Sequence, residues 1–420
     1  MISETLAAPQ TADGLGIRRS LCEDLAVKIL YLEGELSLVE LAARLHLSLA
    51  VVEEVYEHLR KVQLCEVRGM SGTVRRVALS LQGRARAIEL LTHSQYAGAA
   101  PVSLEAYTRQ VRAQSVRDAG VRPEQVERAL SGLVLDKTII SQLGTAVFSG
   151  RAILLCGPPG TGKTAIAECL PGIYSDEVWI PYAVEVDSQI ITVYDSHIHA
   201  ACGDAGGKNC GVSDFTDEDR RWVLCRRPRV VVGGELTPEM LDLRLTSASN
   251  FYSAPLQMKA NNGALIVDDF GRQRMRPEEL LNRWIVPLDR RVDFLTLAGG
   301  KKFEVPFDLF LVLASNTDVA ELADEAFLRR IQTKVRVGYM NVADFREVCR
   351  RMCAHLGLTF DAAVVEEFMV LLASLGQPLR PCYPRDIMQG VCWEALYEER
   401  LPKLDSESIK RACRSYFATA

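Results

Sequence analysis

The stretch from Arg151 to Leu170 constrains this chain more than any other. A short apolar segment, 151–156, is followed directly by a glycine-rich loop and a helix-forming run, and a helix is expected before it at 124–143. The loop and the next residue are Gly157, Pro158, Pro159, Gly160, Thr161, Gly162, Lys163, Thr164 and Ala165. Glycines let backbone N–H groups surround a phosphate at the positive end of a helix, while lysine reaches the outer phosphates and threonine can bind Mg²⁺. The stretch therefore predicts a nucleotide-phosphate site.

Two later apolar runs also end in polar side chains. Residues 263–267 lead into Asp268 and Asp269, and residues 309–315 lead into Asn316. The carboxyl ends of parallel strands meet at one edge of a sheet, where ligands bind. We expect Asp268 to hold Mg²⁺ and Asp269 to orient or deprotonate the attacking water. A lone asparagine at a strand end is usually turn chemistry. Asn316 is nevertheless a candidate site residue, because it follows the third apolar segment in the series 151–156, 263–267 and 309–315.

The N-terminal part of the chain predicts a small unit of helices and strands. Helices are expected at 21–32, 37–45 and 49–62, strands at 64–68 and 73–81, and a last helix at 82–91. Three helices and a two-stranded wing in this order resemble a winged helix-turn-helix domain.

The charges of that unit bear on its partner. The exposed face of the helix at 49–62 carries three glutamates, Glu53, Glu54 and Glu57. A helix that reads a DNA groove usually has a basic face. Protein docking is therefore favoured. DNA binding stays open because the expected wing carries three arginines, Arg68, Arg75 and Arg76.

Bulk properties exclude some classes. The chain has 420 residues, of which 48% are apolar and 25% charged, and this suits a globular protein of two or three domains. Its net charge of −5 offers no general attraction to nucleic acid or anionic membranes. We expect no membrane span, because no apolar run approaches the ~20 residues required. Twelve cysteines lie mostly in apolar stretches, and residues 1–16 lack the pattern of a secretory signal, so we expect a cytoplasmic protein.

The segment 188–227 alternates strand-like and glycine-rich stretches. Its middle contains possible zinc ligands, namely His197, His199, Cys202 and Cys210. Their spacing does not match a common zinc module. A flexible hairpin tip is the preferred interpretation, and zinc binding is the alternative.

Two further motifs follow the phosphate loop, the Asp268-Asp269 pair and Asn316 along the chain. Phe327-Leu328-Arg329-Arg330-Ile331 follows the Asn316 strand, and Pro384-Arg385-Asp386-Ile387 lies in a region with a helical pattern. In this order, the motifs within residues 122–415 resemble an AAA+ ATPase. The resemblance implies an α/β fold with a P-loop AAA+ core, a parallel sheet and a C-terminal α-helical lid. It also implies hydrolysis of ATP to ADP and phosphate, with Mg²⁺ as cofactor.

The resemblance further implies a role for each position. Residues 157–164 match Walker A and residues 264–269 match Walker B. The catalytic set would be Lys163, Asp268, Asp269, Asn316 as sensor 1, Arg330 or Arg329 as arginine finger on the adjacent subunit, and Arg385 as sensor 2. Thr164 and Asp268 would hold the metal. AAA+ proteins commonly have glutamate in the place of Asp269, so slow hydrolysis or a nucleotide-dependent switch is possible.

A hairpin is expected at 291–297 and 302–305, around Gly299-Gly300. It is similar to the pre-sensor-1 hairpin of the MoxR-like and related branches of bacterial chaperone-like ATPases, in which such hairpins engage a client. Residues 289–305, with Phe294 and Phe303, are therefore a candidate client contact. A surface hairpin that packs on its own sheet fits the pattern equally well.

Five parts are expected: a flexible arm at 1–20, the winged helix-turn-helix domain at 21–92, a connector at 93–121, the AAA+ core at 122–340 and the lid at 341–420. The favoured function is a ring ATPase, a homo-oligomer and in particular a hexamer, that binds ATP between subunits and remodels or chaperones a protein. One alternative is a DNA-associated regulator that uses its ATPase as motor or switch. Another is a scaffold that senses ATP with little hydrolysis. The sequence does not name the client, the pathway or the ring size.

Overall fold

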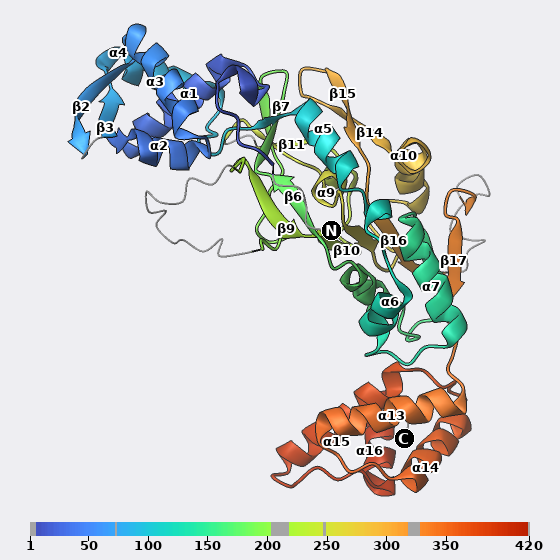
Figure 1. The fold of residues 1–420 in the computed structure, drawn as a ribbon. Coiled ribbons are helices and arrows are strands. Elements are labelled where there is room, and N and C mark those ends of the chain that lie inside the picture. Colours follow the sequence, from blue (N-terminus) through green and yellow to red (C-terminus); the bar gives the residue numbers. More distant parts are fainter. Residues whose placement is uncertain (1–5, 72–73, 203–217, 247–248, 318–327, 419–420) are drawn as a thin grey trace. The chain divides into compact units, whose positions relative to one another are not determined.

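Figure 1 shows the chain in a computed structural model that describes residues 6–71, 74–202, 218–246, 249–317 and 328–418. The fold is mixed α/β, and its contacts divide the chain into two compact units. Unit 1 consists of residues 1–120, 174–265 and 282–310, and unit 2 of residues 121–173, 266–281 and 311–420. The predicted core at 122–340 is therefore divided between the two units. Within the described ranges, no helix is both long and apolar enough to cross a membrane.

The first part of unit 1 is a group of helices beside a small antiparallel sheet of order β1-β3-β2. Its elements are η1 (Asp13–Leu15), α1 (Arg19–Glu33), β1 (Leu36–Ser37), α2 (Leu38–Leu45), α3 (Leu49–Lys61), β2 (Cys65–Ser71), β3 (Val74–Leu79) and α4 (Leu81–His93). Ser37 and Glu40 form a capping box that fixes the start of α2. Val51, Val52 and Val55 of α3 are buried, as their helical spacing predicts.

Residues 6–18 pack against these helices, where a flexible arm was expected. Ala12 and Leu15 are buried. The Ala12 N–H donates to the Glu54 carboxylate at 2.9 Å, and the Ser48 hydroxyl donates to the Pro9 carbonyl at 3.0 Å. The arm has no periodic pattern, so its sequence could not reveal that small side chains fit against the start of α3.

The rest of unit 1 contains a five-stranded sheet and two paired ribbons. Its elements are β4 (Val102–Ser103), α5 (Leu104–Ala113), η2 (Val116–Asp118), β6 (Glu177–Pro181), β7 (Ala183–Val186), β8 (Gln189–Thr192), β9 (Trp222–Arg226), η4 (Pro238–Leu241), β11 (Arg244–Leu245), β12 (Tyr252–Ser253), α9 (Leu256–Lys259), β14 (Val292–Thr296) and β15 (Lys302–Pro306). The sheet order is β11-β12-β8-β7-β4, while β6 pairs with β9 and β14 with β15. The expected connector at 93–121 thus supplies β4 and α5 to this part, and Tyr107 of α5 lies in its core.

A buried arginine joins distant segments of unit 1. Arg221 pairs with Asp219 at 2.8 Å, and the two side chains are 5% and 8% exposed. The same guanidinium donates to the carbonyl oxygens of Leu15 and Pro101 at 3.0 and 3.2 Å. One charge therefore satisfies groups from three parts of the chain.

A central sheet has the strand order β10-β13-β16-β5-β17. The strands are β5 (Ile153–Cys156), β10 (Arg229–Val232), β13 (Ala264–Val267), β16 (Phe310–Ser315) and β17 (Thr333–Arg336). Two of its strands, β5 and β17, lie in unit 2, and β13 and β16 end there, whereas β10 lies in unit 1. β5 pairs in parallel with both β16 and β17, and Cys156 lies opposite Ser315 on one side and Arg336 on the other. The predicted parallel sheet is confirmed.

Two helices, α6 (Pro123–Leu130) and α7 (Lys137–Ser149), replace the single helix predicted at 124–143. The break has a local cause, because the Asp136 side chain accepts a hydrogen bond from the Thr138 N–H and caps α7. The phosphate loop leads into α8 (Lys163–Cys169) and η3 (Leu170–Ile173), and α10 (Pro277–Arg290) follows β13.

The C-terminal region is helical, as predicted. It consists of α13 (Val342–Leu356), α14 (Ala362–Ser374), α15 (Cys382–Tyr397) and α16 (Ser406–Phe417). Phe345 of α13 packs on Phe368 of α14 with ring centroids 5.7 Å apart, in a core to which all four helices contribute. We refer to residues 341–418 as the lid.

Removal of the Arg221 charge should destabilise the fold. We expect Arg221→Gln to lower the free energy of unfolding by about 3 kcal/mol, because it leaves the Asp219 carboxylate buried without its partner. Arg84→Gln, at an exposed position of α4, is the matched control and should change it by less than about 0.5 kcal/mol. Urea denaturation of both variants measures the difference, and equal stabilities would contradict the role given to Arg221.

Candidate active site

The phosphate loop is held by backbone geometry that suits glycine. β5 places four buried residues ahead of it. Gly157, Gly160 and Gly162 have φ angles of 147°, 76° and 91°, a region that other residues rarely adopt. A Cβ at Gly157 would also lie 2.2 Å from the carbonyl oxygen of Val337. The loop ends at Lys163, the first residue of α8. Its N–H groups therefore begin a helix, as an anion site requires.

The Lys163 side chain lies inside the loop. It is 6% exposed, and its ammonium group donates to the carbonyl oxygens of Gly157 and Pro158 at 2.9 and 2.7 Å. Burial lowers the pKa of Lys163, while the carboxylates of Asp269 and Asp268 act in the opposite direction. The lysine thus belongs to one electrostatic cluster with the two acids at the end of β13.

The side-chain oxygens of Thr164 and Asp268 lie close together, as two ligands of one metal ion would. The Thr164 hydroxyl lies 2.9 and 3.2 Å from the two carboxylate oxygens of Asp268. Hydroxyl and carboxylate oxygens suit Mg²⁺, which binds few protein groups and keeps several waters. The chemistry and proximity of these two side chains fit a magnesium ion beside the loop.

Asp269 and Asn316 also lie together. The Asn316 side-chain amide donates to the Asp269 carboxylate at 2.6 Å. Two bonds hold their strand ends in place, because the Phe270 N–H donates to the Ala314 carbonyl and the Ser315 hydroxyl donates to the Phe270 carbonyl. Asp269 has a φ angle of 50°, which turns the chain immediately after β13. The structure therefore brings together the acids and the amide that the sequence singled out.

These residues line a cavity of about 930 Å³ within unit 2. Sequence reasoning missed much of its wall, namely residues 132–136, Ile139, residues 337–341, Asp344, Val348, Arg351, Met352 and His355. Gly132 and the Asp136 cap are signals that could have revealed the break between α6 and α7. Nothing local shows that this break faces the phosphate loop. Arg351 of the lid donates to the Ser131 carbonyl at 2.7 Å and joins the lid to that wall.

The predicted arginines divide into two groups. Arg385, near the start of α15, lines the cavity, and its Nε donates to the Asp386 carboxylate at 2.9 Å. Arg329 and Arg330 lie shortly before the edge strand β17 and are not among the described residues that line the cavity.

The zinc alternative finds no support in the described residues. The His199 Nδ1 accepts from the Asp195 N–H, and its Nε2 donates to the Lys259 carbonyl, both at 2.9 Å. Both ring nitrogens are therefore engaged in a buried side chain, and burial lowers its pKa. No metal-binding group of three or more His, Cys, Asp or Glu occurs in the described part of the chain. Cys210 lies outside the described residues.

The hairpin β14–β15 packs by one face. Leu295 and Phe303 are buried in the core of unit 1, whereas Phe294 is 46% exposed. Lys301, beside its turn, pairs with Asp187 at 2.7 Å. The two phenylalanines therefore differ, and only Phe294 presents its ring to solvent.

Together, the fold and the site define a mixed α/β protein with a phosphate loop, a parallel sheet and a C-terminal helical region. Among family models, a domain of unknown function, DUF8689, matches residues 341–415. No curated protein matches the chain.

Solved structures offer distant similarities. The chain is similar to NtrX from Brucella abortus in complex with ADP, with 14% identity, a TM-score of 0.40, and coverage of 67% of this chain and 56% of that chain. It is also similar to a mutant of RuvB from Thermotoga maritima, with 13% identity, a TM-score of 0.35 and 72% coverage of each chain. The chain thus spans little more than half of NtrX.

A methyl group at Gly157 should disrupt the loop. We expect Gly157→Ala to weaken binding of a fluorescent ATP analogue at least tenfold, because the Cβ would collide with the Val337 carbonyl and strain the backbone. Gly172→Ala is the matched control, since a Cβ there has no neighbour within 4 Å. Fluorescence titration gives both affinities. Unchanged binding by Gly157→Ala would show that the loop does not hold the phosphates.

Proposed function

We propose that this chain is an AAA+ ATPase that hydrolyses ATP at the interfaces of a homo-oligomeric ring, a hexamer, and remodels a protein partner. The observation that carries the proposal is the convergence of Lys163, the Thr164–Asp268 pair and the Asp269–Asn316 pair at adjoining strand ends. The eleven cysteines of the described residues are free thiols, which supports a cytoplasmic location.

Each group has a part in phosphoryl transfer. The loop N–H groups and Lys163 would bind the phosphates, and Thr164 and Asp268 would hold a magnesium ion that supplies positive charge beside the phosphate oxygens. Asp269 accepts a proton from the attacking water, and Asn316 orients the Asp269 carboxylate. The apolar residues of the cavity wall, among them Ile139, would receive the base.

The ring part of the proposal rests on the arginines. A delocalised guanidinium stabilises the charge that develops in phosphoryl transfer. Phe327-Leu328-Arg329-Arg330-Ile331 matches the arginine-finger position of the AAA+ pattern, so we assign Arg330, or its neighbour Arg329, to the nucleotide of an adjacent subunit. Arg385 would act from the lid of the same subunit.

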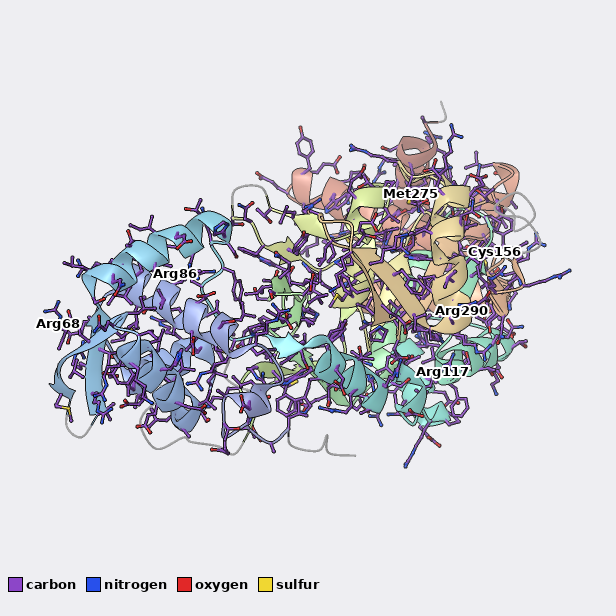
Figure 2. The ribbon with its side chains drawn as sticks, turned by 90° about the horizontal axis from the view of Figure 1, so that it is seen from above. Arg68, Arg86, Arg117, Cys156, Met275 and Arg290 are labelled. Carbon is purple, nitrogen blue, oxygen red and sulfur yellow. The ribbon has the colours of Figure 1, made fainter. Side chains whose placement is uncertain are left out.

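The N-terminal part of unit 1 is better suited to a protein partner than to DNA. Each wing arginine is paired with a glutamate: Arg68 with Glu66, Arg75 with Glu57 and Arg76 with Glu35, all at 2.6 Å. Figure 2 shows Arg68 at the outer edge of this part. Arginines engaged by carboxylates contribute less to binding phosphate backbones. Phe294 of the hairpin is a second candidate contact for the client.

ATP turnover tests the ring. We expect the specific activity to rise with protein concentration, and both Lys163→Ala and Arg330→Ala to abolish it, because the first removes phosphate binding and the second removes the donor to the neighbouring site. Mixing Arg330→Ala subunits into wild-type rings should poison them. Steady-state phosphate release measures each result.

The opposite results are equally clear. A specific activity independent of concentration, together with no poisoning of wild-type activity by Arg330→Ala subunits, would exclude catalysis between subunits. Binding of ATP without any turnover would leave a nucleotide-sensing scaffold, which is consistent with aspartate rather than glutamate at position 269.

The wing provides a test of the DNA-associated alternative. We expect the wild-type chain to give no anisotropy change with a labelled DNA duplex at about 50 mM salt. The double variant Glu35→Gln and Glu57→Gln should gain weak, salt-sensitive binding, because it releases Arg75 from Glu57 and leaves Arg76 only the longer pair with Glu40 at 3.9 Å. Salt-dependent binding by the wild type would favour the DNA-associated regulator.

A further inference from the structure

A segment of the lid lies directly against the phosphate loop. It consists of Arg380, Pro381 and Cys382, at the start of α15. A Cβ built at Gly160 would lie 2.8 Å from the Cys382 sulfur and 3.3 Å from the Arg380 Cδ, and one at Gly162 would lie 3.8 Å from Pro381. The stem of the Arg380 side chain is therefore a direct neighbour of the loop that holds the phosphates.

The Arg380 guanidinium is held by two aromatic rings. Its central carbon lies 5.7 Å from the ring centroid of Tyr339 and 5.6 Å from that of Tyr383. Tyr383 is 3% exposed and fixed by a hydrogen bond from its hydroxyl to Gln377 at 2.8 Å, whereas Tyr339 lines the nucleotide cavity. Such cation–π contacts stabilise the charge without using hydrogen bonds. The edge donors of the guanidinium stay available to an acceptor.

No described carboxylate neutralises this charge, although several other lid arginines have acidic partners. Arg346 pairs with Glu366, Arg351 with Glu347 and Arg411 with Glu394. Arg385, the arginine selected from the sequence, is itself bonded to Asp386. The Arg380 Nε, by contrast, is buried and has no hydrogen-bond partner among the described residues. A buried donor of a charged group without a partner is costly, and an anionic ligand would remove that cost.

We propose that Arg380 is a phosphate-binding residue of the lid, which donates to the outer phosphates of a nucleoside di- or triphosphate in the phosphate loop. This inference rests on the proposed ATPase function and adds a residue to its site. A planar guanidinium is matched in shape to phosphate oxygens and binds them through two parallel donors. Tyr339 and Tyr383 hold the group beside the loop until the anion provides the acceptors.

The same residue would link the nucleotide to the join between core and lid. The Met340 N–H donates to the Leu379 carbonyl at 2.9 Å, so the residues on either side of Arg380 and Tyr339 are already joined. A shift of the guanidinium from the Tyr339 ring towards phosphate would therefore act on residues 337–341, which connect β17 to α13. Binding of the phosphates by Arg380 would in this way change the position of residues 337–341.

Binding measurements with ATP and with inorganic tripolyphosphate test the proposal, because tripolyphosphate has no base to contact Tyr339. We expect Arg380→Gln to raise the Kd for both ligands about tenfold, and Arg380→Lys to recover part of the loss by restoring the charge. Arg414→Gln, an exposed lid arginine on α16, removes the same charge and should leave both Kd values unchanged. Calorimetric titration of the full chain gives the values.

A second measurement needs no variant and holds even if Arg380→Gln fails to fold. Phenylglyoxal modifies arginine side chains, and we expect tripolyphosphate to protect Arg380 but not Arg414 in the wild-type chain, as measured by peptide mass spectrometry. Wild-type affinity in a folded Arg380→Gln variant, or equal modification with and without tripolyphosphate, would overturn the proposal and leave the ATPase intact. Failure of the wild-type chain to bind either ligand would overturn both.

Discussion

The site depends on the backbone register of β5 with its two neighbours. Parallel pairing sets Cys156 opposite Ser315 and Arg336, so the chain leaves three strands at the same level, at Gly157, Asn316 and Val337. The Val337 N–H donates to the Cys156 carbonyl at 2.8 Å and continues this alignment past β17. A shift of one residue in either pairing would displace the loop from its acids by a full strand step of about 3.3 Å. Hydrogen bonds remote from any ligand thus determine the chemistry.

The site also depends on a balance between the charge of Lys163 and the charges of the two acids after β13. Lys163, Asp268 and Asp269 lie in one cluster, and burial of the lysine opposes its charge while the acids favour it. The loop carbonyls that bind the ammonium and the hydroxyl that meets Asp268 satisfy these groups within the protein. An incoming polyphosphate therefore exchanges hydrogen bonds that already exist and does not enter an uncompensated field. The cluster is ready for a ligand of negative charge and a divalent ion.

The sequence was sufficient for the parts of this structure that are local. The phosphate loop, the acids after β13 and Asn316 follow from apolar strands with polar ends, and the helical character of the C-terminal region follows from its helical pattern. The sequence was not sufficient where segments distant along the chain come into contact. The arm at 6–18 has no pattern, yet Ala12 is buried and its N–H donates to the Glu54 carboxylate, a residue 42 positions further along the chain. Nothing in the sequence distinguishes Arg380 from other lid arginines, because only the fold places the rings of Tyr339 and Tyr383 beside its guanidinium.

Two strands of the central sheet connect the two units of the chain. The chain passes from one unit to the other at residues 120, 173, 265, 281 and 310. Two of these passages fall inside β13 and β16, which begin in unit 1 and end in unit 2 immediately before Asp268 and Asn316. Each strand is continuous, so Asp268 and Asn316 directly follow backbone that begins in unit 1.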